Sequence, residues 1–436
     1  MSDEVPALVL PTEILAYIFT ICLPPPPDPH PFRRFNVVNT PSAFRPSEAP
    51  LLVAGVCRRW RNVALSTPHL WVCGCLDFHN KRDAEGVVSS WLSRSLPYPL
   101  SFTLKDHVGL PQVLKETIPH CERWTAVEIL ISHRDPFAFN EVRGRLLCLT
   151  KLSLYLDSSD TFDSFAEAPL LQQVHITGGI NLDTVSILLP WHQLTTLTCE
   201  LFDDVECLEI LRQCAALVDC SLISYDATRS GETILSHPPI LLRRLRSLKL
   251  EGEGNLDVIR LLELPSLRVL RLEVNNDVEI LARFMDRPHF QLESLCLSMV
   301  EPQQLLLCLP FLTSLVTLEV RTYEEFLTEE LLLRLTHDPA VLPNLRTLDI
   351  DVGLQYPHGP AINSLREMIL SRCLGSGSGA ARNVCLETFR LVFRADDEEE
   401  EDGDPHGLMA LTAELGPILE PRMVDFKISA GSDRWV

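Results

Sequence analysis

The sequence has little positive charge for its length. Its 436 residues include 38 lysines and arginines but 59 aspartates and glutamates, which gives a net charge of -21. Nucleic acids and anionic membranes attract proteins through basic surfaces. The balance therefore argues against either of them as the main partner, although a local basic patch is compatible with it.

Long apolar runs are also missing. The run from Ile14 to Leu23 is too short to span a bilayer, and four prolines follow it. The residues before it include Asp3 and Glu4 but no lysine or arginine, so they do not resemble a secretory signal. We therefore expect no membrane segment, and we expect the protein in the cytoplasm, the nucleus or both.

The spacings that mark metal and catalytic sites are absent as well. The 14 cysteines form no CxxC pair, and the 13 histidines form no HExxH motif. Cysteines dispersed in this way indicate reduced thiols, and Cys199 and Cys220 occupy positions that suit a small buried residue. The sequence thus predicts no metal, no cofactor and no catalytic residue.

What the chain does contain is apolar periodicity, since 46% of its residues are hydrophobic. Two stretches near the start have the spacing of helices. In residues 8–22 the spaced residues are Leu10, Ile14, Leu15, Ile18, Phe19 and Cys22, and in residues 51–65 they are Leu52, Val56, Trp60 and Val63. We expect Gly55 to bend the second stretch.

Residues 24–50, between these stretches, contain nine prolines and predict a loop. Pro26 and Pro29 form a PxxP motif, which either binds an SH3-type domain or belongs to a solvated insertion. Helical pieces this small rarely bury enough surface to fold alone, and these carry large apolar residues on more than one face. They need a partner surface, either the rest of the chain or another protein.

The two stretches resemble an F-box. The resemblance rests on L-P-x-E-I-L-x-x-I-F at 10–19, V-C-R-R-W-R-x-V-A at 56–64 and P-x-L-W at 68–71, and the proline-rich insertion departs from it. The three helices of an F-box dock on a Skp-family adaptor and, through it, on a cullin–RING ubiquitin ligase. The resemblance implies adaptor contacts by Leu10, Pro11, Ile14, Leu15, Ile18, Phe19, Val56, Cys57 and Trp60, although some of these, Trp60 among them, can instead face the interior of the three helices.

A leucine pattern repeats through most of the remaining sequence. L-x-x-L-x-L or a close relative begins at Ala126, Leu149, Leu171, Leu194, Leu217, Leu245, Leu267, Leu292, Leu315, Leu345 and Leu386. Most of the intervals fall within the range of about 20 to 29 residues that leucine-rich repeats have. Each L-x-L predicts a short strand with its leucines inward. Helical spacing recurs between the strands, at 205–216, 256–264, 277–286, 326–337 and 362–373.

This region resembles the leucine-rich repeats that follow many F-boxes. The resemblance and the periodicity predict an α/β protein, in which a three-helix F-box precedes an irregular leucine-rich-repeat solenoid with a concave parallel sheet and outer helices. The expected boundaries are 1–72 for the F-box, with its proline-rich insertion at about 24–50, 73–125 for a connecting segment, 126–394 for the solenoid, and 395–436 for an acidic loop and a C-terminal cap. Trp91 and Trp124 are expected in the core of the connecting segment.

Side chains between the inward leucines are expected on the concave sheet, where solenoids of this kind bind proteins. The candidates for contact with a target protein are Tyr155, His175, Lys249, Arg271, Glu319, Arg321, Asp349 and Arg390. Each of them can instead be an ordinary solvated residue, since few residues dominate an interface. The glycines at 375–379 predict a flexible insertion, and the eight acids at 396–404 predict either a solvated loop or a site for a basic partner.

The sequence thus predicts the substrate-recognition subunit of an SCF-type (Skp–cullin–F-box) ubiquitin ligase, with no enzymatic activity of its own. An F-box-containing scaffold that binds partners without directing ubiquitination is the main alternative. An enzyme that uses the repeat surface is a further alternative, which the lack of a clustered nucleophile, base or metal set disfavours. The sequence does not test whether the repeats sense a small molecule.

Overall fold

The structure is a computed structural model. It describes residues 10–23, 47–76, 81–105, 110–130, 136–156, 162–178, 187–200, 204–223, 237–252, 256–273, 278–287, 291–322, 327–338, 340–352, 359–374, 384–393, 405–420 and 423–430. The chain divides into two compact units, Met1–Ser221 and Leu222–Val436. The PxxP motif, most of the proline-rich insertion, the glycines at 375–379 and the acidic run at 396–404 lie outside the described residues.

The first unit begins with helices and continues with strands. Its helical start comprises α1 (Thr12–Ile21), α2 (Leu51–Val56), α3 (Arg58–Leu65) and the 3-10 helix η3 (Pro68–Trp71). We call α1, α2 and α3 the helical module. The strands and helices that follow are β1 (Cys73–Leu76), α4 (Lys81–Arg94), β2 (Leu100–Lys105), α5 (Leu110–Thr117), η4 (Ile118–Arg123), β3 (Trp124–Leu130), η5 (Pro136–Val142), β4 (Lys151–Leu156), β5 (Gln173–Gly178), η7 (Trp191–Gln193), β6 (Thr196–Glu200), α6 (Asp204–Gln213) and β7 (Asp219–Ile223), the last of which crosses the boundary between the units.

The second unit alternates strands with helices. Its elements are β8 (Ile240–Leu241), β9 (Ser247–Glu251), α8 (Leu256–Leu261), β10 (Leu262–Glu263), β11 (Val269–Glu273), α9 (Val278–Met285), β12 (Ser294–Ser298), α10 (Pro302–Cys308), η8 (Leu309–Phe311), β13 (Thr317–Thr322), α11 (Glu329–His337), β14 (Thr347–Val352), α12 (Gly359–Leu374), β15 (Thr388–Phe393), α13 (Pro405–Leu419) and β16 (Asp425–Ala430). Helices are present in all five of the stretches where the sequence predicts them, with ends that differ by a few residues.

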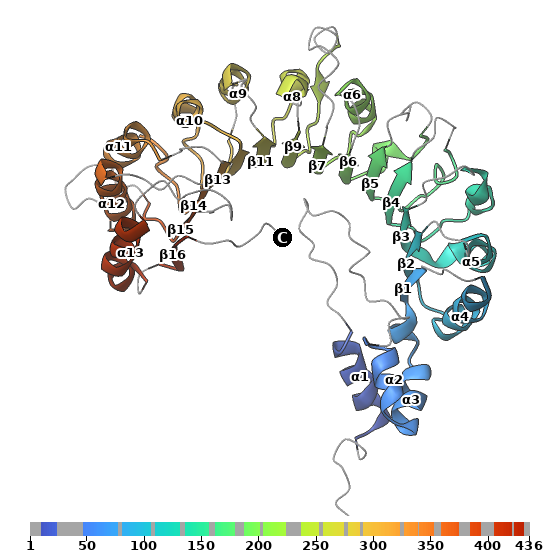
Figure 1. Cartoon of the computed structure of the whole chain (residues 1–436). Helices are drawn as coiled ribbons and strands as arrows, with labels where there is room; N and C mark the ends of the chain where they lie inside the picture. Colours follow the sequence, from blue (N-terminus) through green and yellow to red (C-terminus); the bar gives the residue numbers. More distant parts are fainter. Residues whose placement is uncertain are drawn as a thin grey trace, which may run out of the picture. The chain divides into compact units, whose positions relative to one another are not determined.

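The strands join a 14-stranded sheet in chain order, β1-β2-β3-β4-β5-β6-β7-β9-β11-β12-β13-β14-β15-β16, while β8 pairs only with β10. Every strand pair with a defined register is parallel. Within the second unit, α8 to α13 all lie on one face of the strands (Figure 1). The opposite side of the strands is called the helix-free face below. The α/β class and the parallel sheet are thereby confirmed.

The leucine pattern locates the strands closely. Within the large sheet, every strand from β4 to β15 begins two residues after one of the predicted pattern starts. The leucines at those ten starts, from Leu149 to Leu386, are at most 3% exposed. Full burial of one leucine side chain contributes about 1.5–3 kcal/mol, so these ten positions together stabilise the sheet substantially.

The first pattern start, at Ala126, is wrong by two residues. Strand β3 pairs with β4 so that Ala126 is opposite Lys151, and Lys151 lies two residues after Leu149. The equivalent start in β3 is therefore Trp124, which is completely buried. A tryptophan occupies the leucine position, and its indole ring packs edge-on against Phe102 at 5.1 Å between ring centroids.

The sheet also extends beyond both expected boundaries. The connecting segment at 73–125 contributes β1 and β2, and the C-terminal cap at 395–436 contributes β16. The registers place Trp71 before β1 and Met423 before β16 where the other strands have leucine, so a search for leucines misses these two strands. In β2 the register shifts by one residue after Leu100, which lies opposite Trp124, and this shift breaks the leucine spacing. Trp91 and Trp124 are buried, as predicted.

Backbone hydrogen bonds show how one strand is joined to the next. In the second unit the N–H groups of Val316 and Thr317 both donate to the carbonyl of Glu293, at 2.8 and 3.0 Å. Those of Glu293 and Ser294 donate in the same way to the carbonyl of Arg268, at 2.8 and 3.0 Å. Each connection thus satisfies two donors with one acceptor at an equivalent position, just before the strand begins.

A buried arginine fixes the connection between α11 and β14. The guanidinium of Arg372, on α12, donates to the carbonyls of Leu335, Val341 and Leu342, at 2.7, 2.8 and 3.2 Å. Burial lowers the pKa of Arg372, but three hydrogen bonds to carbonyl oxygens compensate for the lost hydration.

Among the described residues, no helix has the length and apolar character needed to cross a membrane.

Candidate functional site

The helical module has a small aromatic core of its own. Leu15 and Phe19, one turn apart on α1, are buried, and the Phe19 ring lies 5.0 Å from that of Trp60 on α3. Trp71 joins the module to the rest of the first unit, because its indole N–H donates to the Ala64 carbonyl at 2.8 Å and the Arg94 guanidinium covers its ring at 4.7 Å.

The second and third helices separate at Cys57, and not at Gly55 as the sequence suggested. Cys57 has extended backbone angles, and its sulfur accepts a hydrogen bond from the Trp60 N–H at 3.4 Å. A thiol in this position caps the first turn of α3. Gly55 lies within α2, where a single glycine is tolerated because the helix ends one residue later, at Val56.

The first two helices of the module each expose a stripe of apolar side chains to solvent. On α1 the exposed fractions are 46% for Ile14, 66% for Tyr17 and 65% for Ile21, and on α2 they are 53% for Leu52 and 59% for Val56. On each helix the spacing of three, four or seven residues puts these side chains along one stripe. We call these five residues the apolar face. A cluster of large exposed apolar side chains marks a site of protein or membrane interaction.

The structure divides the predicted adaptor contacts into three groups. Pro11, Ile14 and Val56 are exposed, whereas Leu10, Ile18, Cys57 and Trp60 are half-buried. Leu15 and Phe19 are buried within the module, so they support the apolar face and do not belong to it. Sequence reasoning missed Tyr17, Ile21 and Leu52, although the i, i+3, i+7 spacing of Ile14, Tyr17 and Ile21 contains the signal.

The helix-free face of the second unit carries rows of charged residues in register. The registers of β9 to β15 align five of the predicted target contacts in one row across the sheet: Lys249, Arg271, Glu319, Asp349 and Arg390. Cys296 of β12 occupies the same row between Arg271 and Glu319. The sixth contact in this unit, Arg321, lies two residues farther along β13 than Glu319.

The charges in these rows pair with one another. Arg271 and Arg321 both approach Glu319, with nitrogen-to-oxygen distances of 3.4 and 3.6 Å. Lys249 pairs with Glu251 at 2.8 Å between nitrogen and oxygen. The pKa of Asp349 is raised, first by burial and then by the neighbouring charge of Glu319. The rows therefore form a network of paired charges and not a field of one sign.

Two predicted target contacts lie in the first unit, and one of them is not exposed. Tyr155 on β4 is half-buried. The expectation that His175 is exposed is wrong, because this side chain is only 8% exposed and its Nε2 lies 3.3 Å from Glu200 Oε1 on the neighbouring strand. Thr177 also lies 3.4 Å from Glu200 Oε2. The three residues thus form a polar contact between the neighbouring strands β5 and β6.

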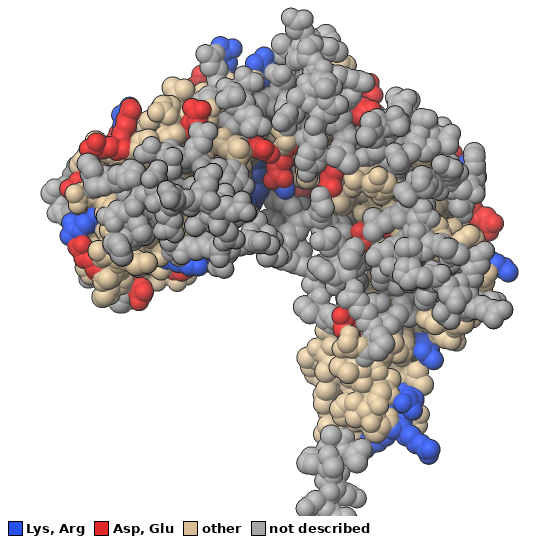
Figure 2. Space-filling model, viewed as in Figure 1, with Lys and Arg blue, Asp and Glu red and all other residues tan. Residues whose placement is uncertain are grey.

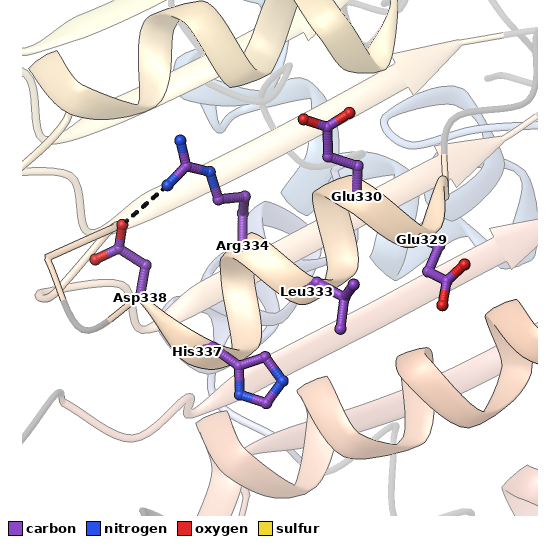
Figure 3. Close-up of a pocket in the computed structure, with 6 residues that line it drawn as sticks. All are labelled: Glu329, Glu330, Leu333, Arg334, His337 and Asp338. Atoms are coloured by element: carbon purple, nitrogen blue, oxygen red, sulfur yellow. Dashed lines mark hydrogen bonds and ion pairs between the residues drawn. The ribbon is translucent and has the colours of Figure 1, made fainter.

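A shallow hollow of about 670 Å³ lies on the outer surface of α11. Figure 3 shows its six lining residues, which all come from α11 or the residue after it: Glu329, Glu330, Leu333, Arg334, His337 and Asp338. Arg334 and Asp338 form an ion pair at 3.4 Å. The carboxylates of the first turn and the imidazole of the last turn do not converge, so this arrangement provides no nucleophile and base for catalysis.

The two cysteines predicted to be buried lie in the core, and the described residues contain no cluster suited to a metal ion. Cys199 and Cys220 are buried as predicted, and burial raises the pKa of both thiols well above the usual value. Protonated, buried thiols are weak nucleophiles and weak metal ligands. No group of three or more histidine, cysteine, aspartate or glutamate side chains among these residues is arranged to hold a metal ion.

The chain matches no protein-family model, and no curated protein has a significantly similar sequence. The apolar face and the charged rows of the sheet are therefore interpreted from their own chemistry.

Proposed function

We propose that this protein is the substrate-recognition subunit of an SCF-type ubiquitin ligase. In this proposal the helical module is an F-box that docks on a Skp-family adaptor, and the strand-helix repeats are leucine-rich repeats that hold a target protein. The observation that carries the proposal is the apolar face, which exposes five large side chains on the two helices of a sequence that resembles an F-box.

The proposed mechanism is proximity. One end of the chain binds the adaptor, and the helix-free face of the sheet binds the target, so that target lysines are held near the ubiquitin that the ligase carries. Paired charges on that face support recognition of a protein surface with a defined pattern of charge, since displacement of an existing ion pair requires a matching partner. The ligase supplies the chemistry of ubiquitin transfer, and this chain supplies the two contacts.

Co-expression with a Skp-family adaptor tests the first contact. We expect a stoichiometric complex that Ile14→Asp abolishes, because the substitution places a carboxylate in the apolar face. Leu188→Asp is the matched control: Leu188 is 47% exposed, almost the same as Ile14, but lies outside the module. Failure of the folded wild-type chain to bind the adaptor would remove the basis of the proposal.

Ubiquitin transfer distinguishes a receptor from a scaffold. A receptor brings the cullin into the complex and shortens the lifetime of a bound target in cells, and Ile14→Asp restores that lifetime. A scaffold binds the adaptor equally well but leaves the target's lifetime unchanged.

A further inference from the structure

The charge of the helical module differs from that of the chain. The described residues that form its three helices and their ends, 10–23 and 47–65, contain three arginines and two glutamates. The arginines are Arg58, Arg59 and Arg61, and the glutamates are Glu13 and Glu48. In the whole chain, by contrast, acidic residues outnumber basic ones by 59 to 38. Figure 2 shows the module as a largely tan surface with blue side chains gathered at its α3 side. A local basic patch thus adjoins the apolar surface.

Arg58 and Arg61 are the accessible part of this patch. They are exposed and lie three residues apart, on one side of α3, while Val63 on the opposite side is buried. Neither arginine has an ion pair within the described residues, whereas exposed arginines elsewhere often do, such as Arg346 with Glu387. The positive charges of Arg58 and Arg61 are therefore available to a partner.

Arg59 fixes the position of this patch relative to the apolar face. Its guanidinium donates to the carbonyl of Leu10, just before α1 begins. The bond ties the first turn of α3 to the start of the helix that carries Ile14, Tyr17 and Ile21. The positive charges of Arg58 and Arg61 are thus held at the margin of the surface that the proposed adaptor covers.

We propose that the protein partner on the apolar face carries a cluster of carboxylates that meets Arg58 and Arg61. This inference rests on the proposed function and adds the chemistry of the partner's margin. The net charge of -21 repels an acidic partner from most of the chain, so the two arginines steer it to the module and set its orientation. An anionic membrane is the other surface that combines apolar contact with negative charge, and the experiment separates the two.

The test measures association of the purified full chain with a Skp-family adaptor at low and at high salt. For the wild type we expect the association rate to fall as salt rises. For Arg58→Glu/Arg61→Glu we expect association about tenfold slower at low salt, with the difference disappearing at high salt. Acidic residues in the first turn of a helix are favourable, so this variant keeps α3 folded.

Arg243→Glu/Arg244→Glu is the control. It changes the net charge by the same amount at two exposed, adjacent arginines of the second unit, and we expect an association rate within about twofold of the wild type. Equal slowing by both variants would mean that only net charge matters and would overturn the inference.

The other outcomes are also decisive. Salt-independent binding that Ile14→Asp abolishes but Arg58→Glu/Arg61→Glu leaves intact would keep the proposed function and reject the acidic partner. No adaptor binding at any salt would reject both. Binding of the chain to phosphatidylserine vesicles that Arg58→Glu/Arg61→Glu removes, with adaptor binding unchanged, would assign the patch to a membrane and overturn the inference.

Discussion

The helical module and the sheet differ in how they bury their apolar residues. Along the sheet, the leucines at the repeated positions are buried, because each strand and helix completes the core of its neighbours. On the module, α1 and α2 bury one stripe and expose another. Residues that hold the fold are thus separated from residues that are available for binding, and substitutions on each side of that division should have different consequences.

The largest loss is expected at the centre of the module. Phe19→Ala should destabilise the module by about 3–5 kcal/mol, because it removes a fully buried ring that packs against Trp60. Ile21→Ala, on the exposed stripe of the same helix, should weaken adaptor binding and leave stability nearly unchanged. Hydrogen exchange of the α1–α3 amides measures the stability of the module in both variants. Equal loss of protection in the two variants would contradict the division between core and surface.

A similar loss is expected in the sheet. Leu194→Ala should cost about 2–5 kcal/mol, since Leu194 is completely buried at a repeated leucine position. Leu188→Ala, an identical change at a half-exposed site in the preceding loop, should have a much smaller effect. The urea midpoint of unfolding compares the two. A small effect at Leu194 would mean that the repeated leucines do not hold the sheet together.

A smaller loss of stability is expected at the buried arginine that binds the connection between α11 and β14. Arg372→Met should cost about 1–3 kcal/mol, because it leaves buried carbonyl groups without their donor. Arg366→Met removes an exposed arginine that pairs with Glu414 on the same side of the unit, and we expect a much smaller change in the urea midpoint. If the order is reversed, surface ion pairs contribute more than buried capping in this protein.

The smallest effect is expected on the helix-free face, as a dependence on pH. The native pKa of Asp349 is raised above its usual value of 3.8, so the folded state binds more protons than the unfolded state between those two values. The free energy of unfolding therefore falls as pH rises through that interval. Asp349→Asn should be more stable than the wild type at neutral pH, and the difference should vanish in acid. Urea midpoints over this pH range would show no convergence if burial of Asp349 were unimportant.

The sheet was predictable wherever leucine itself carries the pattern. Leucines from Leu149 to Leu386 locate ten strands to the residue, because a repeated buried position tolerates few alternatives in so regular a stack. Trp124 shows why the pattern failed at the ends. A larger or differently shaped side chain fills the same position where the stack meets other structure, and a search for leucine then finds a false start at Ala126.

The proposed binding surface was predictable only in part. The motif at 10–19 and 56–64 led to the correct helices, but it did not distinguish buried Leu15 and Phe19 from exposed Tyr17 and Ile21. Which stripe of an apolar helix faces inward depends on the contacts of α1 with α3, above all the Phe19–Trp60 contact, and a single sequence does not contain them. The burial of His175 depends in the same way on Glu200, which lies on another strand.

The carbonyl shared at connections such as those before β12 and β13 makes the number of strands in the sheet adjustable. Glu293 and Val316 are equivalent residues, so a chain without residues 292–314 still offers the Arg268 carbonyl to the N–H groups of Val316 and Thr317. Deletion or duplication of one whole repeat would preserve every such bond on either side. Evolution or a protein engineer is therefore able to change the number of strands in the sheet in steps of one repeat, without redesigning the connections between them.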